Sequence, residues 1–400
     1  MQKISRPEPV RLGRDFYQSP WELYALLREQ ASVREVVLPN GIPCWLVTSY
    51  DDARALLADS RLGKDYHHAI ELLPPEVAAQ FASPLYAHML NTDPPDHTRF
   101  RKLVTKAFTS RMVEGLRPRI EQVAAGLLDA MPAGATADLI SAYALPLPVA
   151  VISHMLGVPE ADRDRFRDWT LSFVADTTPE ALAEDSRQLS AFLSALIEDK
   201  RAHPGDDLIS RLVQVSDNGD QLSAGELLNM IFLLLVAGFE TTVNLVGNAV
   251  LALLHHPGQL ALLQSDPALL TGAVEEFLRY EGPVNIATNR FTTEPVRVGG
   301  ADIPAGQYVL VSLLAANRDE RQFADPGRLD ITRPPGAHLG FGHGIHHCVG
   351  APLARLEGQI AIGALLRRFP GLVLAAKPED LRWRDSTQMH GLHELPVRLS

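Results

Sequence analysis

The longest uninterrupted apolar run, residues 230–239, lies inside a segment with the features of one long helix. Ser223 and Glu226 have the spacing of a capping box, and Pro257 would stop the helix after His256. A helix of that length is roughly 50 Å long at ~1.5 Å per residue, so it would cross a whole domain. The apolar run is too short to span a bilayer, and we expect a buried core helix.

The rest of the pattern predicts a mainly α protein with a minor β component. Ser19 and Glu22 resemble a second capping box, with Pro20 at the first helical position. Strands are predicted at residues 33–38 and 44–48, and a strand-like segment at the C-terminus. Helices are predicted over most of residues 96–203, over 268–280 and from just after Cys348 to about residue 369. Composition never shifts as it would at a linker, so we expect a single domain, 1–400.

Residues 64–92 lack a clean period and read as a long, partly structured loop, a kind of segment that is often functional. We expect its Phe81, Tyr86 and Met89 to form part of a lid over the substrate pocket.

Composition narrows the possible functions. The chain is 46% hydrophobic and 21% charged, which is typical of a globular protein, and its net charge of −11 argues against nucleic acid as a partner. Residues 1–15 have no apolar stretch like that of a secretory signal. Two cysteines, Cys44 and Cys348, do not resemble a disulfide framework. We therefore expect a cytoplasmic protein without a membrane anchor.

The segment around Cys348 is the strongest sign of chemistry. A lone cysteine is usually a small buried hydrophobe. Here four glycines (340, 342, 344 and 350) surround it, which core packing does not require and which permits close approach of the backbone to a ligand. The cysteine also sits where a helix begins, so nearby N–H groups favour the thiolate. A thiolate can bind iron axially.

Phe341, Gly344, Cys348 and Gly350 match F-x-x-G-x-x-x-C-x-G, and this stretch resembles the haem-binding loop of the cytochrome P450 family. The resemblance implies the family's single-domain fold, with a long central helix over haem b (iron protoporphyrin IX) and Cys348 as the iron ligand. Its motifs are most similar to those of soluble actinobacterial enzymes of secondary metabolism, including macrolide hydroxylases.

Two further motifs of that family occur in order. Glu276 and Arg279 resemble its E-x-x-R pair, which implies a buried structural cluster completed by Arg328, although Leu329 stands where relatives usually have an aromatic residue. Taken alone, the tetrapeptide would be an ordinary surface ion pair.

The stretch Ala237-Gly238-Phe239-Glu240-Thr241 resembles the oxygen-activation motif. It implies that Ala237 and Gly238 border the haem and that Glu240 and Thr241 are catalytic, delivering protons to bound oxygen. Gly238 and the threonine would let the helix open locally. The alternative is a small-residue packing site with an exposed acid.

Haem carries two carboxylates that need partners when buried. His97 and Arg101 lie about 40° apart on one face of their predicted helix and resemble the family's propionate ligands, as do Arg290 and His346. On the opposite face lie Arg99, Lys102 and Lys106, where an acidic ferredoxin could dock. An ordinary exposed helix face is almost as good an explanation.

The resemblance implies a monooxygenase that inserts one oxygen atom of O₂ into an apolar small molecule, with electrons from NAD(P)H through ferredoxin reductase and ferredoxin, acting as a monomer. Two alternatives stay open: a peroxide-driven hydroxylase, and a non-enzymatic haem protein acting as a sensor or electron carrier. The substrate pocket is expected to include Leu233, Leu234, Ala237, Ile286, Ala287 and Met389. These residues suit a macrolactone, terpenoid, steroid or fatty acyl group.

Overall fold

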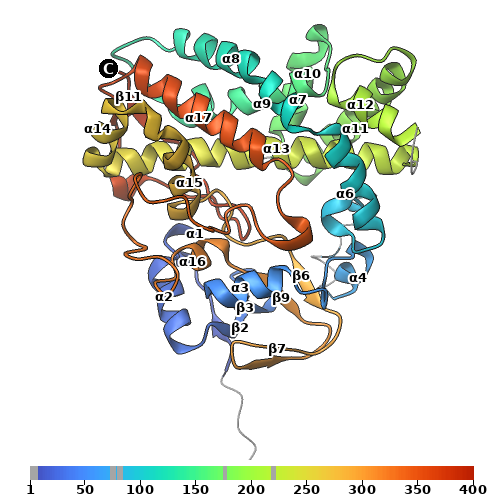
Figure 1. Ribbon diagram of the computed structural model, residues 1–400, viewed down its shortest axis with the longest axis vertical. Coiled ribbons are helices and arrows are strands. Elements are labelled where there is room, and N and C mark those ends of the chain that lie inside the picture. The colour runs from blue at the N-terminus through green and yellow to red at the C-terminus, as the bar shows by residue number, and fades with distance from the viewer. Residues whose placement is uncertain (1–7, 73–77, 79–83, 174–177, 218–221) are drawn as a thin grey trace, which may run out of the picture.

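The computed structural model describes residues 8–72, 78, 84–173, 178–217 and 222–400, and it is built around one long helix (Figure 1). This helix, α13 (Ala224–His255), has 32 residues and runs across the whole molecule. The predicted capping box closes its start: the Ser223 hydroxyl accepts from the Glu226 N–H at 3.2 Å, and the Glu226 carboxylate accepts from the Ser223 N–H at 2.7 Å. By length and composition α13 could cross a membrane, but two-thirds of its most apolar stretch is buried and it is a core helix.

Most other helices pack on one side of α13 or along it. Pro146 and Pro179 each stand in the first turn of a new helix. The larger helices are α6 (Asp96–Ala107), α8 (Arg117–Asp129), α9 (Pro146–Met155), α10 (Arg163–Leu171), α11 (Pro179–Ala202), α12 (Leu208–Asp217), α14 (Pro257–Ser265), α15 (Leu270–Tyr280) and α17 (Ala351–Arg368).

A six-stranded sheet lies on the other side of α13, accompanied by the helices α2 (Trp21–Gln30), α3 (Tyr50–Leu57) and α16 (Leu313–Asn317). Its order is β1 (Val10–Arg11), β2 (Val33–Val37), β3 (Pro43–Val47), β9 (Tyr308–Val311), β6 (Arg290–Thr292) and β4 (Leu62–Gly63). The strands β2 and β3 form the expected antiparallel hairpin, and Gly41 in its turn has a φ of 86°.

Two small sheets complete the fold. One joins β10 (Val373–Leu374), β11 (Pro396–Arg398) and β5 (Thr136–Asp138), and the other pairs β7 (Val296–Val298) with β8 (Ala301–Ile303). The predicted mainly α class with a minor β component is confirmed.

Ser19 does not cap α2, because its N–H ends the preceding short helix α1 (Asp15–Gln18) by donating to the Asp15 carbonyl, and Pro20 is the N-cap residue. The predicted loop over residues 64–92 contains the short helix α4 (Tyr66–Glu71) and two 3₁₀ turns. Phe81, expected in the lid, lies outside the described residues.

Candidate active site

A large apolar cavity separates α13 from the loop that carries Cys348. Its empty volume is about 1420 Å³, part of which is open to solvent. Ala237, Gly238 and Thr241 line it from α13, and Phe341 and Cys348 line it from the loop. Segments more than a hundred residues apart in sequence therefore meet at one site.

The loop aims the Cys348 thiol into this cavity. The Cys348 N–H donates to the Phe341 carbonyl at 2.9 Å, and Gly342 and Gly344 adopt φ values of 72° and 75°. A Cβ at Gly344 would stand 2.6 Å from the Leu57 carbonyl oxygen, so this position requires glycine.

The Cys348 thiol is accessible from the cavity although protein surrounds it. Burial raises its pKa, while the N–H groups of Gly350 and Ala351 and the Arg101 charge oppose that shift. We had expected the N–H groups at the helix start to favour the thiolate, but the effect of burial outweighs them. A metal ion bound to sulfur would reverse the balance, because coordination deprotonates a thiol.

On the opposite wall, the two threonines of α13 bond to their own helix. The Thr241 hydroxyl donates to the Ala237 carbonyl at 2.9 Å, and the Thr242 hydroxyl donates to the Gly238 carbonyl at 3.2 Å. The helix is continuous through this motif, so the expected local opening is not observed. Glu240 is half-buried, and burial raises the pKa of its carboxyl while the Arg384 charge lowers it.

At one end of the cavity, four basic residues converge as predicted: His97, Arg101, Arg290 and His346 all line it. The His97 and His346 rings lie 4.2 Å apart between centroids. His97 Nε2 is buried and has no hydrogen-bond partner among the described residues. Burial and the neighbouring cations lower the pKa of His346 to about 2.

This cluster has the chemistry that haem propionates require. Arg290 is buried, it donates to the Thr288 carbonyl at 2.9 Å, and Asp93 is the acidic group that acts on its charge. Buried cations and an orphaned imidazole nitrogen are unfavourable unless an anion joins them. The residues present therefore fit a haem whose carboxylates lie here and whose iron faces Cys348.

Sequence reasoning missed one member of this cluster, Lys64. Its side chain is only 3% exposed, its ammonium donates to the Thr288 hydroxyl, and its charge acts on Arg290. A lysine in an aperiodic segment is normally solvated, so no signal in the sequence distinguished it.

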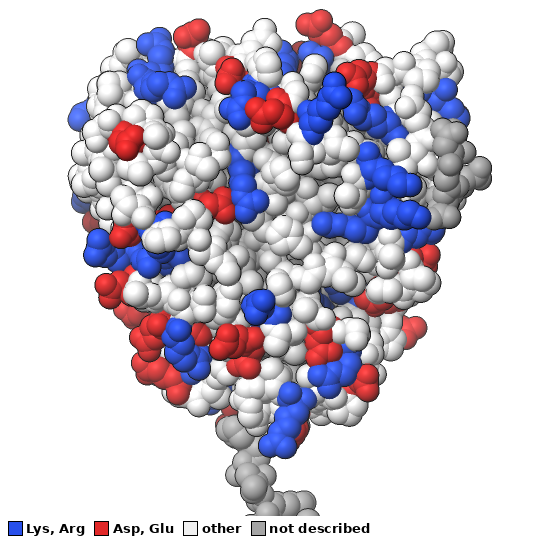
Figure 2. Space-filling model, in the orientation of Figure 1, with Lys and Arg blue, Asp and Glu red and all other residues white. Residues whose placement is uncertain are grey.

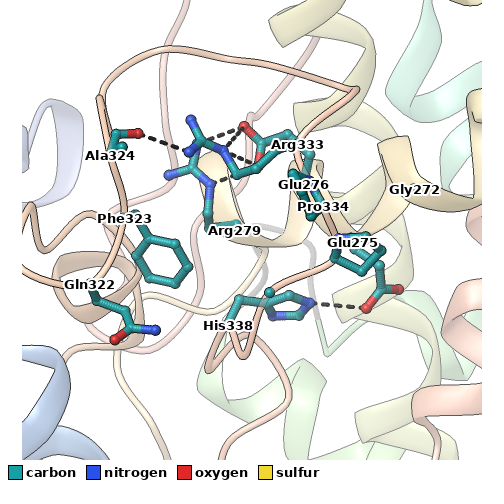
Figure 3. A pocket seen from close by; sticks show the side chains of 12 residues that line it. Gly272, Glu275, Glu276, Arg279, Gln322, Phe323, Ala324, Arg333, Pro334 and His338 are labelled. Atoms are coloured by element: carbon teal, nitrogen blue, oxygen red, sulfur yellow. Dashed lines mark hydrogen bonds and ion pairs between the residues drawn. The ribbon is translucent and has the colours of Figure 1, made fainter.

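The E-x-x-R pair is a buried structural cluster, with one correction (Figure 3). Two hydrogen bonds of 2.7 Å join Arg279 to Glu276, and both side chains are 2% exposed. Arg333, rather than Arg328, is the third partner, with its Nε 3.3 Å from the Glu276 carboxylate. The Arg328 side chain is 64% exposed and lies 3.5 Å from Asp330. Arg328 contributes only its backbone carbonyl to the cluster, which accepts from Arg279.

Leu233, Leu234, Ala237 and Ala287 line the cavity as predicted, together with Met89. Ile286 does not: neighbouring residues of an extended segment face opposite sides, and Ile286 packs under the sheet near Phe16 and Tyr24. Neither Met389, whose backbone pairs with Val284, nor Tyr86 is among the lining residues described. Residues of the wall that we had not predicted include Ile152, Met155, Val284, Thr288 and Leu313.

The outer side of α6 is basic (Figure 2). We call this the basic groove: it is lined by His97, Thr98, Arg101, Lys102, Thr105, Lys106 and Ile345. Arg99, predicted to belong to the same stripe, instead forms an ion pair with Glu226 at the start of α13.

A mainly helical fold that holds a cysteine loop beneath a long central helix defines a haem-thiolate monooxygenase. The profile of the family described as Cytochrome P450 matches residues 264–397. Cytochrome P450 107B1 of Saccharopolyspora erythraea is 52% identical over 397 residues, 98% of each chain. The chain belongs to the cytochrome P450 family.

Other relatives are similar to this chain over nearly its whole length. Cytochrome P450 monooxygenase PikC of Streptomyces venezuelae is 50% identical, covering 97% of this chain and 92% of that one. The structure of tirandamycin C-bound P450 monooxygenase TamI superposes with a TM-score of 0.91 at 47% identity, covering 98% of this chain and all of the other. The protein is thus an oxygen-dependent enzyme that acts on small molecules and receives electrons from redox partners.

Proposed function

We propose that this enzyme hydroxylates or epoxidises a macrolactone or related polyketide in secondary metabolism. The observation that carries the proposal is the apolar cavity bounded by Thr241 on one wall and Cys348 on the other. Two relatives support the substrate class: one is a mycinamicin IV hydroxylase/epoxidase, 43% identical over 94% of each chain, and another is a 6-deoxyerythronolide B hydroxylase.

The haem is proposed to be haem b. Cys348 would bind its iron, and His97, Arg101, Arg290 and His346 would hold its propionates, with Phe341, Gly350, Ala237 and Gly238 around the ring. Gly344, also expected at the haem, is not among the lining residues described and packs against the Leu57 carbonyl instead. When bound, this group supplies O₂ activation at a thiolate-ligated iron. The chain's own contribution is to fix the group, exclude water with apolar walls and place donors at the reacting oxygen.

Proton delivery is assigned to Glu240 and Thr241. Thr241 reaches the cavity, and Glu240 lies next to it in sequence, with a carboxyl pKa that burial raises. A peroxide-driven route has no use for such a pair, which is why we favour O₂ with electrons from a ferredoxin and its reductase. We further propose that the enzyme acts in the cytoplasm as a monomer and that residues 1–400 form one domain.

The test combines binding and turnover. Macrolactones, terpenoids, steroids and fatty acids are titrated into the holoenzyme and binding is followed by the change in the haem absorption band. The compounds that bind are then supplied with ferredoxin, its reductase and NAD(P)H, or with peroxide alone. We expect a macrolactone to give the strongest spectral change and a product that requires NAD(P)H. Equal product from peroxide alone, or preferential turnover of fatty acids, would contradict the proposal.

A further inference from the structure

Lys64 is a buried lysine directly behind the wall of the cavity. It lies just after β4, and its side chain is not among those that line the cavity. Its ammonium donates to the hydroxyl of Thr288, which does line it. The Thr288 carbonyl in turn accepts from Arg290 Nη1 at 2.9 Å. Thr288 thus connects a hidden lysine to an arginine of the propionate cluster.

Burial of this charge is costly, and the cluster around it increases the cost. Desolvation and the Arg290 charge both lower the Lys64 pKa, and the charge of Lys64 also acts on His97, His346 and His88. A lysine with no function would escape to water along its flexible stem. The local excess of positive charge indicates that an anion is meant to occupy this end of the cavity.

Asp93 fixes the position of Lys64 without neutralising the cluster. Its carboxylate accepts from the Lys64 N–H at 2.8 and 3.1 Å and from the Asp65 N–H at 2.9 Å. It therefore holds the backbone from which the lysine side chain starts. It is also the acidic group that opposes the pKa shifts of Lys64, His97 and Arg290.

We propose that Lys64 is a positioning residue for the haem. Lys64 orders Thr288 and Arg290 against a propionate, and its positive charge raises the reduction potential of the iron. Asp93 partly offsets the charge of Lys64. This inference rests on the propionate assignment proposed above. Adding an electron to the iron makes the site more negative, and a cation in a low-dielectric interior stabilises that reduced state. The sequence analysis assigned this lysine no role, and it is separate from the four basic residues that line the cavity.

Two charge changes of opposite sign test the inference. In the holoenzyme, Lys64→Met keeps much of the side-chain volume and removes the cation, so the reduction potential should fall. It should also speed haem transfer to apomyoglobin by about tenfold, in the range seen when residues that support a metal's ligands are lost. Asp93→Asn keeps an acceptor and removes the anion, so the potential should rise. Lys377→Met, an exposed lysine near the C-terminus, should change neither quantity.

A purely structural role predicts a different pattern. Both Lys64→Met and Asp93→Asn would then lose haem, with no opposite shift of potential, and that result would overturn the inference. Thr288→Val separates positioning from charge: haem transfer should accelerate while the potential changes less than in Lys64→Met. Lys64→Arg keeps the cation and should stay near the wild-type potential. If Lys64→Met does not fold, Asp93→Asn still decides the sign of the effect.

Failure of the propionate assignment would look different. In that case Arg290→Gln and His97→Phe would retain haem as well as the wild type. If those two variants lose haem while Lys64→Met matches the wild type in both potential and haem transfer, only the role of Lys64 is wrong.

Discussion

The two cysteines of this chain show how position decides chemistry at the scale of a residue. Cys44 is buried in β3 among apolar side chains, and burial raises its thiol pKa to about 12. Cys348 faces a cavity and receives N–H groups from Gly350 and Ala351. The same side chain is therefore an inert core residue at one position and the proposed metal ligand at the other.

Replacing each cysteine separates these roles. Cys348→Ala should abolish the red-shifted absorption band of the reduced carbon monoxide complex, because that band requires thiolate ligation. Cys44→Ala should keep the band and lose only some stability, measured by thermal unfolding. Loss of the band in Cys44→Ala would show that the ligand assignment is wrong.

Thr241 has a hydroxyl that reaches the cavity, and its loss should uncouple electron use from product formation. We expect Thr241→Ala to bind substrate and haem almost normally. Its product formation should fall roughly 10²–10⁴-fold, the usual contribution of a group that transfers protons. Oxygen that has been reduced but not correctly protonated should leave as peroxide. The measurement is product and peroxide per NAD(P)H consumed.

The control for Thr241→Ala is a substitution of the neighbouring Thr242 that preserves its contacts. Thr242 is buried, and its hydroxyl bonds both the Gly238 carbonyl and Glu357, so alanine there would disturb the packing of α13. Thr242→Ser keeps the hydroxyl and should stay coupled. Normal coupling in Thr241→Ala would mean that another group delivers the proton.

At the scale of elements, the Glu276–Arg279 cluster ties α15 to the later loop. Arg333→Ala should lower the free energy of unfolding by roughly 1–3 kcal/mol, because it leaves a buried carboxylate with one partner fewer. Arg328→Ala should change it by about 0.5 kcal/mol or less, as for most exposed positions. Denaturant unfolding of the two holoenzyme variants compares them directly. A larger loss in Arg328→Ala would restore our original assignment.

This difference shows where sequence reasoning stops. The capping box at Ser223 could be predicted because both partners lie three residues apart on one helix. Arg333 could not be chosen over Arg328, since both lie in an aperiodic loop and only its path decides which side chain turns inward. The prediction that Ile286 faces the cavity was wrong for the same reason. The sequence motifs predicted the cavity walls. The position of Lys64 beside the propionate cluster could be recognised only from the structure, in which β4 pairs with β6.

Glu357 of α17 packs against α13 and makes the stability of that contact depend on pH. Its carboxyl is buried, Oε2 has no hydrogen-bond partner among the described residues, and burial raises its pKa to about 8. The folded protein therefore holds a proton that the unfolded chain releases near pH 4.3. Between that pH and about 8 the contribution of Glu357 to stability falls as pH rises, and above about 8 it is constant.

Glu357→Gln removes this dependence because the amide stays neutral. The variant should match the wild type near pH 4.5 and be more stable at pH 8.5 by up to a few kcal/mol, at about 1.4 kcal/mol for each pKa unit separating the folded and unfolded states. Urea unfolding of the holoenzyme at both values measures the difference. A stability difference that is the same at both pH values would contradict the raised pKa.

At the scale of the whole molecule, the basic groove stands out because the chain carries a net charge of −11. Figure 2 shows Lys and Arg gathered over α6, and the groove includes Ile345, which is 53% exposed and three residues before Cys348. A partner seated here would lie on the cysteine side of the haem. An acidic ferredoxin would be attracted to the groove while the rest of the surface repels it, which orients the encounter.

Charge reversal in the groove should therefore slow electron delivery without altering the haem site. We expect Lys102→Glu with Lys106→Glu to raise the KM for an acidic ferredoxin by about tenfold or more, since steering contributes roughly 10–10³-fold to association rates. The carbon monoxide spectrum should be unchanged. The wild-type rate should fall as salt increases, because screening shortens the reach of these charges to about 8 Å at physiological ionic strength, and the variant should lose most of that dependence. Lys377→Glu makes half the change in net charge away from the groove, and an effect on KM as large as that of the double variant would show that total charge, rather than the groove, guides the partner.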